Sequence, residues 1–210
     1  MFFAEETDKA LRFGDVINGF VLAASNIKNP DFTSEYQLDI NTPTHSVILS
    51  PCCSIGDKKI SLTPLIKIKQ DFFENQYFAD DLTRINRKME PRQSVSEIAW
   101  SKMPPEEQLK RLKEGLGYAL VDNFIYEQNN LLAKYTLKKK GSSTEIETNY
   151  YMIDFRNIYK INCDKVVSPT DSPVHKKELQ LSIKARGELR DKIANYYSRI
   201  PKEDITGEEE

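Results

Sequence analysis

The stretch VILSPCCSIGDKKISLTPLIKI, residues 47–68, contains two apolar runs separated by a short polar segment. The first run is aliphatic and ends at Pro51, which is typical of a short buried strand. The second run places apolar residues at every other position between Ile60 and Ile68, which predicts another strand, and Pro64 within it favours an edge position or a bulge. The stretch therefore predicts two β-strands joined by a turn.

Further strand-like segments lie on both sides of this stretch. FGDVINGFVLAA (residues 13–24) is rich in β-branched and aromatic residues, and SEYQLDI (residues 34–40) alternates apolar and polar residues as a half-buried strand does. Later in the chain, YALVDNFIYE, LLAKYTLKK and TEIETNYYMIDF, within residues 118–155, predict a three-stranded β-meander whose hairpin turns are QNN and KKGSS.

Helical patterns occupy the middle and the end of the chain. From Asp71 onward apolar residues recur at helical spacing, and MPPEEQLKRLKEGLG (residues 103–117) has a proline near its start and glycines at its end. SIKARGELRDKIANYYSRI (residues 182–200) predicts a C-terminal helix with Ser182 as its N-cap.

We therefore expect an α+β fold, either an SH3-like small barrel or a strongly bent antiparallel sheet. The expected domain organisation is one barrel-like domain over residues 1–180, with a helical insert near residues 71–116, followed by a C-terminal helix and acidic tail over residues 181–210.

The composition indicates a folded chain with balanced charge. Hydrophobic residues make up 39% of the sequence, which is enough to fill a core. Thirty basic and thirty-two acidic side chains give a formal charge of −2, so no overall attraction to nucleic acid or membrane is expected. The first residues lack the pattern of a secretory signal, no apolar run has the roughly 20 residues that span a bilayer, and three cysteines do not form a disulfide framework. We expect a cytoplasmic protein without a cofactor.

Three segments in order, GDVINGF (Gly14–Phe20), VILSP (Val47–Pro51) and ISLTPL (Ile60–Leu65), resemble the first strands of the MazF/PemK type of SH3-like small barrel. The resemblance covers about the first third of the chain and implies a barrel. The ribonuclease chemistry of that family uses an arginine just before the Val-Leu-Ser strand. The matching stretch NTPTHSVILS has no arginine, and Arg12 or Arg156 would have to supply one from elsewhere.

The whole chain also resembles an uncharacterised group of bacterial proteins. The segments that carry this similarity are LSPCCSI, IDFR (Ile153–Arg156) and ARGELRDKIANYYSR. In that group an aspartate follows the cysteine, whereas this chain has Ser54 there. The resemblance brings no known activity.

The thiols at Cys52 and Cys53 leave four interpretations open. Cys53 is a candidate nucleophile if His45 folds back beside it as a base and Asp15 orients that histidine. A metal site would draw on Cys52, Cys53, Cys163, His45 and His175. A vicinal disulfide and simple packing as small apolar groups complete the set. Adjacent residues on a strand point to opposite faces, so at most one of the two thiols faces a site.

A second candidate metal site consists of carboxylates alone. Asp15, Glu145, Glu147 and Asp154 have the oxygen ligands that hard cations prefer. The alternation in TEIET is equally typical of a strand whose charged side chains face solvent.

Basic residues near a predicted hairpin form a candidate nucleic-acid site, because small barrels often bind nucleic acid. The run KYTLKKKG contains the candidate lysines Lys134, Lys138, Lys139 and Lys140. A lysine-rich hairpin also serves as a protected, soluble sheet edge.

The function we expect is a non-enzymatic binding or adaptor protein of a bacterial multi-gene system, of the antiviral defence or toxin–antitoxin kind, with nucleic acid as a further candidate ligand. The alternatives are a MazF-like nuclease with an altered active site and a cysteine- or metal-dependent enzyme centred on Cys53. A cluster of aromatic residues in the helical insert is the candidate protein interface: Phe72, Phe73, Tyr77 and Phe78.

Overall fold

The computed structural model describes residues 1–8, 10–18, 21–27, 36–51, 54–55, 59–68, 97–114, 123–138, 143, 145–162 and 177–198. The first part of the predicted helical insert, both adjacent cysteines and the aromatic cluster at residues 72–78 lie outside these ranges.

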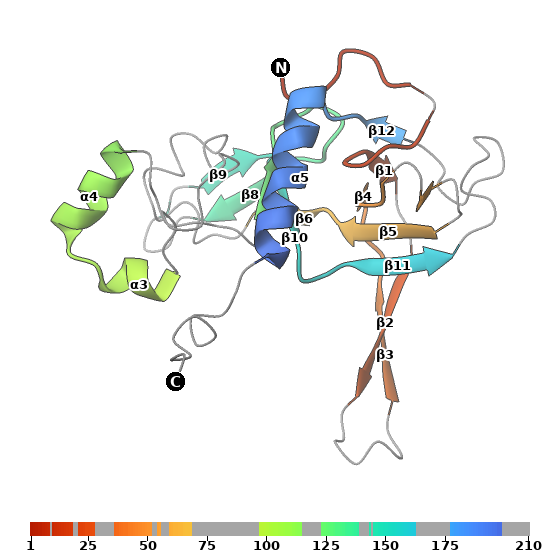
Figure 1. Ribbon diagram of the computed structural model, residues 1–210, viewed down its shortest axis with the longest axis horizontal. Helices are drawn as coiled ribbons and strands as arrows, with labels where there is room; N and C mark the ends of the chain where they lie inside the picture. The colour runs from red at the N-terminus through yellow and green to blue at the C-terminus, as the bar shows by residue number, and fades with distance from the viewer. Residues whose placement is uncertain are drawn as a thin grey trace, which may run out of the picture.

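The largest sheet has five antiparallel strands in the order β11-β5-β4-β1-β12 (Figure 1). They are β1 (Val16–Asn18), β4 (His45–Ile48), β5 (Lys59–Pro64), β11 (Tyr159–Asn162) and β12 (Lys177–Leu179). β12 pairs with β1, placing Ile17 opposite Lys177 and Val16 opposite Leu179, with an irregularity between the two pairs. A late strand thus pairs with the first one, and the N-terminal segment lies close by, because Phe3 forms a β-bridge with Leu181 just after β12.

A second antiparallel sheet has the order β6-β10-β7, with β6 (Ile66–Lys67), β7 (Asn123–Tyr126) and β10 (Tyr151–Asp154). Leu65 alone separates β5 from β6, so the chain passes from the first sheet into the second within one residue. The chain returns after β10 through a turn held by Asp154, whose carboxylate accepts hydrogen bonds from Arg156 and from Asn157. Direct crossings of this kind make sharp corners between packed sheets.

The predicted meander is confirmed in the pairing of its second segment with its third, and it is wrong in the pairing of its first segment. β7 pairs with β10, while β8 (Tyr135–Lys138) and β9 (Glu145–Thr148) form a separate ribbon, named here the β8–β9 hairpin. The segment read as one strand over residues 144–155 is broken at Asn149, whose side chain donates to the Asn129 carbonyl at 2.7 Å. The predicted QNN turn is part of a longer connection in which Asn129 accepts hydrogen bonds from the backbone of Leu131 and Leu132.

β2 (Leu22–Ile27) and β3 (Tyr36–Asn41) pair only with each other among the described strands. Figure 1 shows this ribbon projecting away from the two larger sheets, next to β11. We call it the β2–β3 arm.

Three α-helices lie in the described part of the chain: α3 (Glu97–Lys102), α4 (Pro105–Lys113) and α5 (Ile183–Tyr197). α4 begins at the predicted proline. The predicted N-cap of α5 is confirmed, because the Ser182 hydroxyl accepts a hydrogen bond from the Ala185 N–H at 3.2 Å.

Both faces of the five-stranded sheet are buried, and successive residues of β1 belong to different clusters. Val16 packs with residues of the second sheet and with Leu189 of α5, whereas Ile17 packs with Ile48 and with Leu22 at the base of the arm.

The strands and helices together confirm the predicted mixed α+β class. The described strands form several antiparallel sheets and do not close into a barrel.

Candidate functional site

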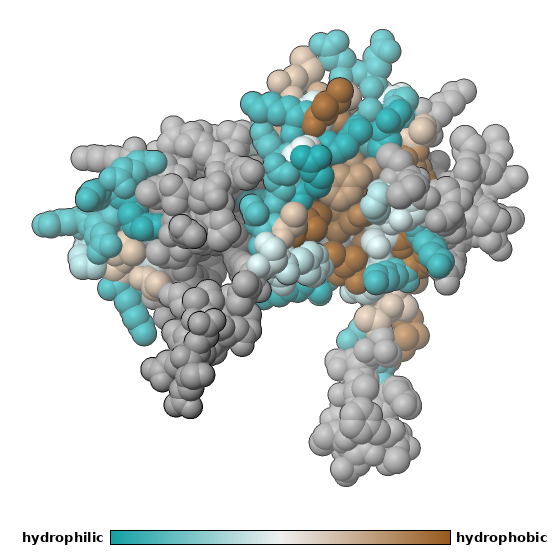
Figure 2. Space-filling view, viewed as in Figure 1, coloured by the Kyte–Doolittle hydropathy of each residue, from teal (hydrophilic) through white to brown (hydrophobic). Residues whose placement is uncertain are grey.

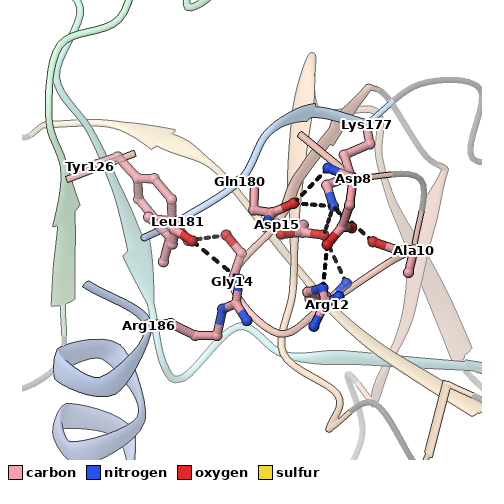
Figure 3. A network of polar contacts seen from close by, with 10 residues as sticks. All are labelled: Asp8, Ala10, Arg12, Gly14, Asp15, Tyr126, Lys177, Gln180, Leu181 and Arg186. Atoms are coloured by element: carbon pink, nitrogen blue, oxygen red, sulfur yellow. Dashed lines mark hydrogen bonds and ion pairs between the residues drawn. The ribbon is translucent and has the colours of Figure 1, made fainter. Parts of the chain in front are cut away.

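A charged network joins β12 to the loop that precedes β1 (Figure 3). The Asp15 side chain is fully buried, and its Oδ2 atom lies 2.9 Å from Nζ of Lys177. The same ammonium donates hydrogen bonds to Asp8 Oδ1 at 3.0 Å, the Ala10 carbonyl at 2.7 Å and Gln180 Oε1 at 2.6 Å. Only 9% of the Lys177 side chain is exposed, so these oxygens replace the water that the cation has lost.

The loop itself is shaped to present Asp15. The backbone N–H of Arg12 donates to Asp15 Oδ2 at 2.8 Å, and Arg12 Nε donates to Asp8 Oδ2 at 2.7 Å. Gly14 has a φ of 84°, in the left-handed region that favours glycine. Its carbonyl accepts a hydrogen bond from the Tyr126 hydroxyl at 3.2 Å, which fixes the loop against β7.

The two carboxylates of this network have pKa values shifted in opposite directions, because burial dominates at Asp15 and the hydrogen bond from Lys177 dominates at Asp8. Burial raises the pKa of Asp15, and the attraction of Lys177 offsets this only in part. The hydrogen bond from Lys177 lowers the pKa of Asp8, which is much more exposed. Lys177 therefore holds the N-terminal segment and β12 together through one partly exposed and one buried partner.

A second buried polar pair involves the next residue of β12. Nδ1 of His45 lies 2.8 Å from Oε2 of Glu178, and 5% of the histidine side chain is exposed. Neither atom forms a hydrogen bond within the described residues. The two atoms are therefore close enough for an ion pair, but their geometry is not that of a hydrogen bond. The imidazole ring meets the Tyr151 ring edge-on, with the ring centroids 6.3 Å apart.

The predicted pairing of Asp15 with His45 is not what the described residues show. His45 lies opposite Asn18 on β1, so the two side chains share one face of the sheet. Successive residues alternate between the faces, so the side chain of Asp15, three residues before Asn18, points to the opposite face from His45. Each takes its own partner from β12, Lys177 for Asp15 and Glu178 for His45. Cys53, the candidate nucleophile, lies outside the described residues, and its role stays a prediction.

The carboxylates considered for a hard cation are each paired with a nearby basic side chain. Lys134 Nζ lies 2.7 Å from Glu147 Oε1, Lys138 Nζ lies 3.5 Å from Glu145 Oε1, and Asp154 is bound by the guanidinium of Arg156. Within the described ranges no group of three or more His, Cys, Asp or Glu side chains is placed to hold a metal ion. Cys52, Cys163 and His175 fall outside those ranges.

The same ion pairs bear on the candidate nucleic-acid site. Lys134 and Lys138 are well exposed but lie across the β8–β9 hairpin from two glutamates. The described charges on this hairpin therefore come in pairs of opposite sign, which is typical of a protected ribbon edge. Lys139 and Lys140 lie outside the described residues.

The β2–β3 arm is the feature that sequence reasoning misjudged. The alternation in SEYQLDI predicted a half-buried strand, but Leu38 and Ile40 are 61% and 63% exposed. Their face of the ribbon also includes exposed Ala23, which lies directly opposite Ile40, and Val21 just before β2 is 62% exposed. We call Val21, Ala23, Leu38 and Ile40 the apolar face of the arm.

The other face of the arm is polar on β3 and anchors the ribbon on β2. Gln37, Asp39 and Asn41 alternate with the apolar residues and are exposed, while Leu22 is 1% exposed in the core. Figure 2 shows hydrophobic atoms on the surface of the described part of the arm, where it leaves the body. The alternation in the sequence reflects a truly amphipathic strand, but it does not reveal that the apolar side is exposed.

The aromatic cluster Phe72, Phe73, Tyr77 and Phe78 lies outside the described residues, so its role as an interface stays a prediction. No helix within the described residues is long and apolar enough to span a membrane.

Comparison with known proteins returns no family model, no curated protein and no solved structure that matches this chain.

Proposed function

We propose that this chain is a non-enzymatic binding protein, an adaptor of a bacterial multi-gene system of the defence or toxin–antitoxin kind, and that it associates with other protein chains through the β2–β3 arm. One observation supports the proposal: the arm projects from the body with its apolar face in solvent. A two-stranded ribbon in water is marginally stable unless one of its faces packs against something. An exposed apolar patch on a projecting element is typical of an association surface.

The buried polar pairs described above fit a structural role for the rest of the molecule. Asp15 and Asp154 are paired with Lys177 and Arg156, and His45 lies against Glu178. Groups held in this way stabilise the scaffold that positions the arm.

The small-barrel kinship is part of the proposal. The segments GDVINGF, VILSP and ISLTPL contribute β1, β4 and β5, which are neighbours in one antiparallel sheet. This adjacency supports a relationship to SH3-like barrels in which the sheet has not closed. It also favours the second candidate function, a MazF-like nuclease with an altered active site near His45.

The test compares the wild-type chain with two double variants on the same strand. Leu38→Glu with Ile40→Glu places two charges on the apolar face, and Gln37→Glu with Asn41→Glu places the same charges on the polar face. Each tagged protein is used to retain partner chains from cells that contain the whole gene system. We expect a partner that wild type and the polar-face variant retain and that the apolar-face variant loses.

A nuclease assay on the same preparations decides between the two candidates. RNA and DNA are incubated with the protein, with divalent metal and with EDTA. Cleavage that disappears in His45→Ala or Asp154→Ala would overturn the adaptor proposal. Bound zinc in native mass spectrometry, or a fast-reacting thiol lost in Cys53→Ser, would instead favour the cysteine- or metal-dependent alternative.

A further inference from the structure

We propose that the occupant of the apolar face is a second copy of this chain, so that two β2–β3 arms pack face to face in a two-fold dimer. The inference rests on the proposed function, which makes the arm an association surface, and it names the partner. Two-fold dimers bury the same patch on both subunits, so the patch has to be complementary to itself.

Charge is the first argument for self-complementarity. The apolar face, Val21, Ala23, Leu38 and Ile40, contains no charged residue. An uncharged patch meets its own copy without the like-charge repulsion that a charged patch would suffer. The formal charge of the whole chain, −2, also adds little repulsion between two copies.

The other two-stranded ribbon among the described residues provides an internal comparison. The β8–β9 hairpin packs Tyr135 and Leu137 of one face against the core, and the charged Glu145 and Glu147 project from its other face. On the β2–β3 arm the charged residue of the two strands, Asp39, lies on the polar face, and the apolar face is exposed as well. Of these two ribbons, the hairpin covers its apolar face with its own core, whereas the arm leaves its apolar face exposed for another chain to cover.

The size of the face predicts the strength of the dimer. Six paired residues at about 3.4 Å each make a face roughly 20 Å long. Two strands about 4.8 Å apart make this face roughly 10 Å wide, so its area is roughly 200 Å². This area is well below the roughly 800 Å² that each partner buries in a standard stable interface. We therefore expect a dimer that dissociates on dilution rather than a permanent one.

The test is the mass of the purified chain in solution, measured by sedimentation velocity and by light scattering over a dilution series. Wild type is expected to show twice the mass of the chain at high concentration and the monomer mass on dilution. Leu38→Glu with Ile40→Glu is expected to remain monomeric at every concentration. Gln37→Glu with Asn41→Glu adds the same charge to the same strand on the other face and is expected to dimerise like wild type.

Folding of each variant is checked by circular dichroism and thermal unfolding, and Leu38→Ser with Ile40→Ser is a second apolar-face variant that adds no charge. A wild-type monomer at all concentrations would overturn the inference, as would equal dissociation of the two glutamate variants. If the monomer still retains a different protein through the apolar face, the second copy is excluded while the proposed adaptor function stands. If the dimer forms through the arm but no other protein is retained, the adaptor function fails and the dimer stands.

Discussion

Nζ of Lys177 lies 2.9 Å from Oδ2 of Asp15, and this contact joins the last strand of the five-stranded sheet to the loop before the first. Because Asp15 is fully buried, its negative charge depends on this cation for compensation. Lys177 also holds Asp8 and Gln180, so one ammonium fixes the N-terminal segment, the loop and β12 in a single arrangement.

Lys177→Met is expected to destabilise the protein by about 3–5 kcal/mol at neutral pH, the usual cost of leaving one member of a buried ion pair uncompensated. Urea unfolding followed by circular dichroism measures the effect. Lys184→Met, at an exposed position of α5, is the matched control and should change the free energy of unfolding by less than about 0.5 kcal/mol. Adding Asp15→Asn to Lys177→Met should recover part of the loss, and a double variant no more stable than Lys177→Met would contradict the coupling.

The pH dependence of stability should distinguish the two carboxylates. Burial raises the pKa of Asp15 above its ordinary value of 3.8, so the folded protein binds this proton more readily than the unfolded chain does. The resulting contribution to stability is fully present below pH 3.8 and is lost as the pH rises through the raised pKa. The pKa of Asp8 is lowered by Lys177, so its contribution has the opposite sign and is lost as the pH falls through the lowered pKa.

We therefore expect the free energy of unfolding of wild type, relative to Asp15→Asn, to decrease as the pH rises from about 4 toward neutrality. The same difference relative to Asp8→Asn should decrease as the pH falls below 3.8. The basic neighbours Lys177, Arg12 and Arg186 are present in both variants and are therefore common to both measurements. Stability differences that change with pH in the same direction for the two variants would contradict the opposite pKa shifts of Asp15 and Asp8.

Two glycines should respond to alanine in opposite directions. At Gly14 the φ of 84° is unfavourable for alanine, and a Cβ atom would lie 2.7 Å from Cδ1 of buried Leu181. Backbone strain and overpacking of about 1–3 kcal/mol each make Gly14→Ala strongly destabilising. Gly187 lies inside α5 with no atom within 4 Å of an added Cβ, so Gly187→Ala should stabilise by about 0.5–1 kcal/mol. Chemical denaturation of both variants tests the pair, and a neutral Gly14→Ala would show that the loop adapts.

Local patterns in the sequence predicted the elements better than their partners. The strand expected around VILS is the fully buried β4, which spans His45–Ile48 and ends two residues earlier than VILS does. Ser182 caps α5 and α4 begins at Pro105. Each of these features depends on a few neighbouring residues. The pairing of β7 with β10 depends on a break at Asn149 and on a turn at Asn129, which a short apolar pattern does not reveal. Long-range pairings are decided by the packing of both sheets rather than by any one segment.

The candidate site shows the same limit. Asp15 and His45 were singled out as chemically capable side chains, and both are buried, but their partners are two successive residues of β12 that no motif marked. The alternation in SEYQLDI was recognised, yet period-2 amphipathicity is the same for a strand covered by its own core and for one covered by another chain. The apolar face of the arm could therefore be found only once the exposure of Leu38 and Ile40 was known.

The paired charges of the β8–β9 hairpin lead to a last prediction. Lys134 and Lys138 are exposed, so replacing both by alanine should change the free energy of unfolding by less than about 1 kcal/mol. Because Glu147 and Glu145 offset these lysines, we expect the hairpin to contribute little to nucleic-acid affinity in wild type. Glu145→Gln with Glu147→Gln should release the lysines, raise affinity for a duplex oligonucleotide and steepen its salt dependence, as fluorescence anisotropy at several salt concentrations measures. Tight, strongly salt-dependent binding by wild type that is lost in Lys134→Ala with Lys138→Ala would instead make this hairpin a nucleic-acid site in spite of its ion pairs.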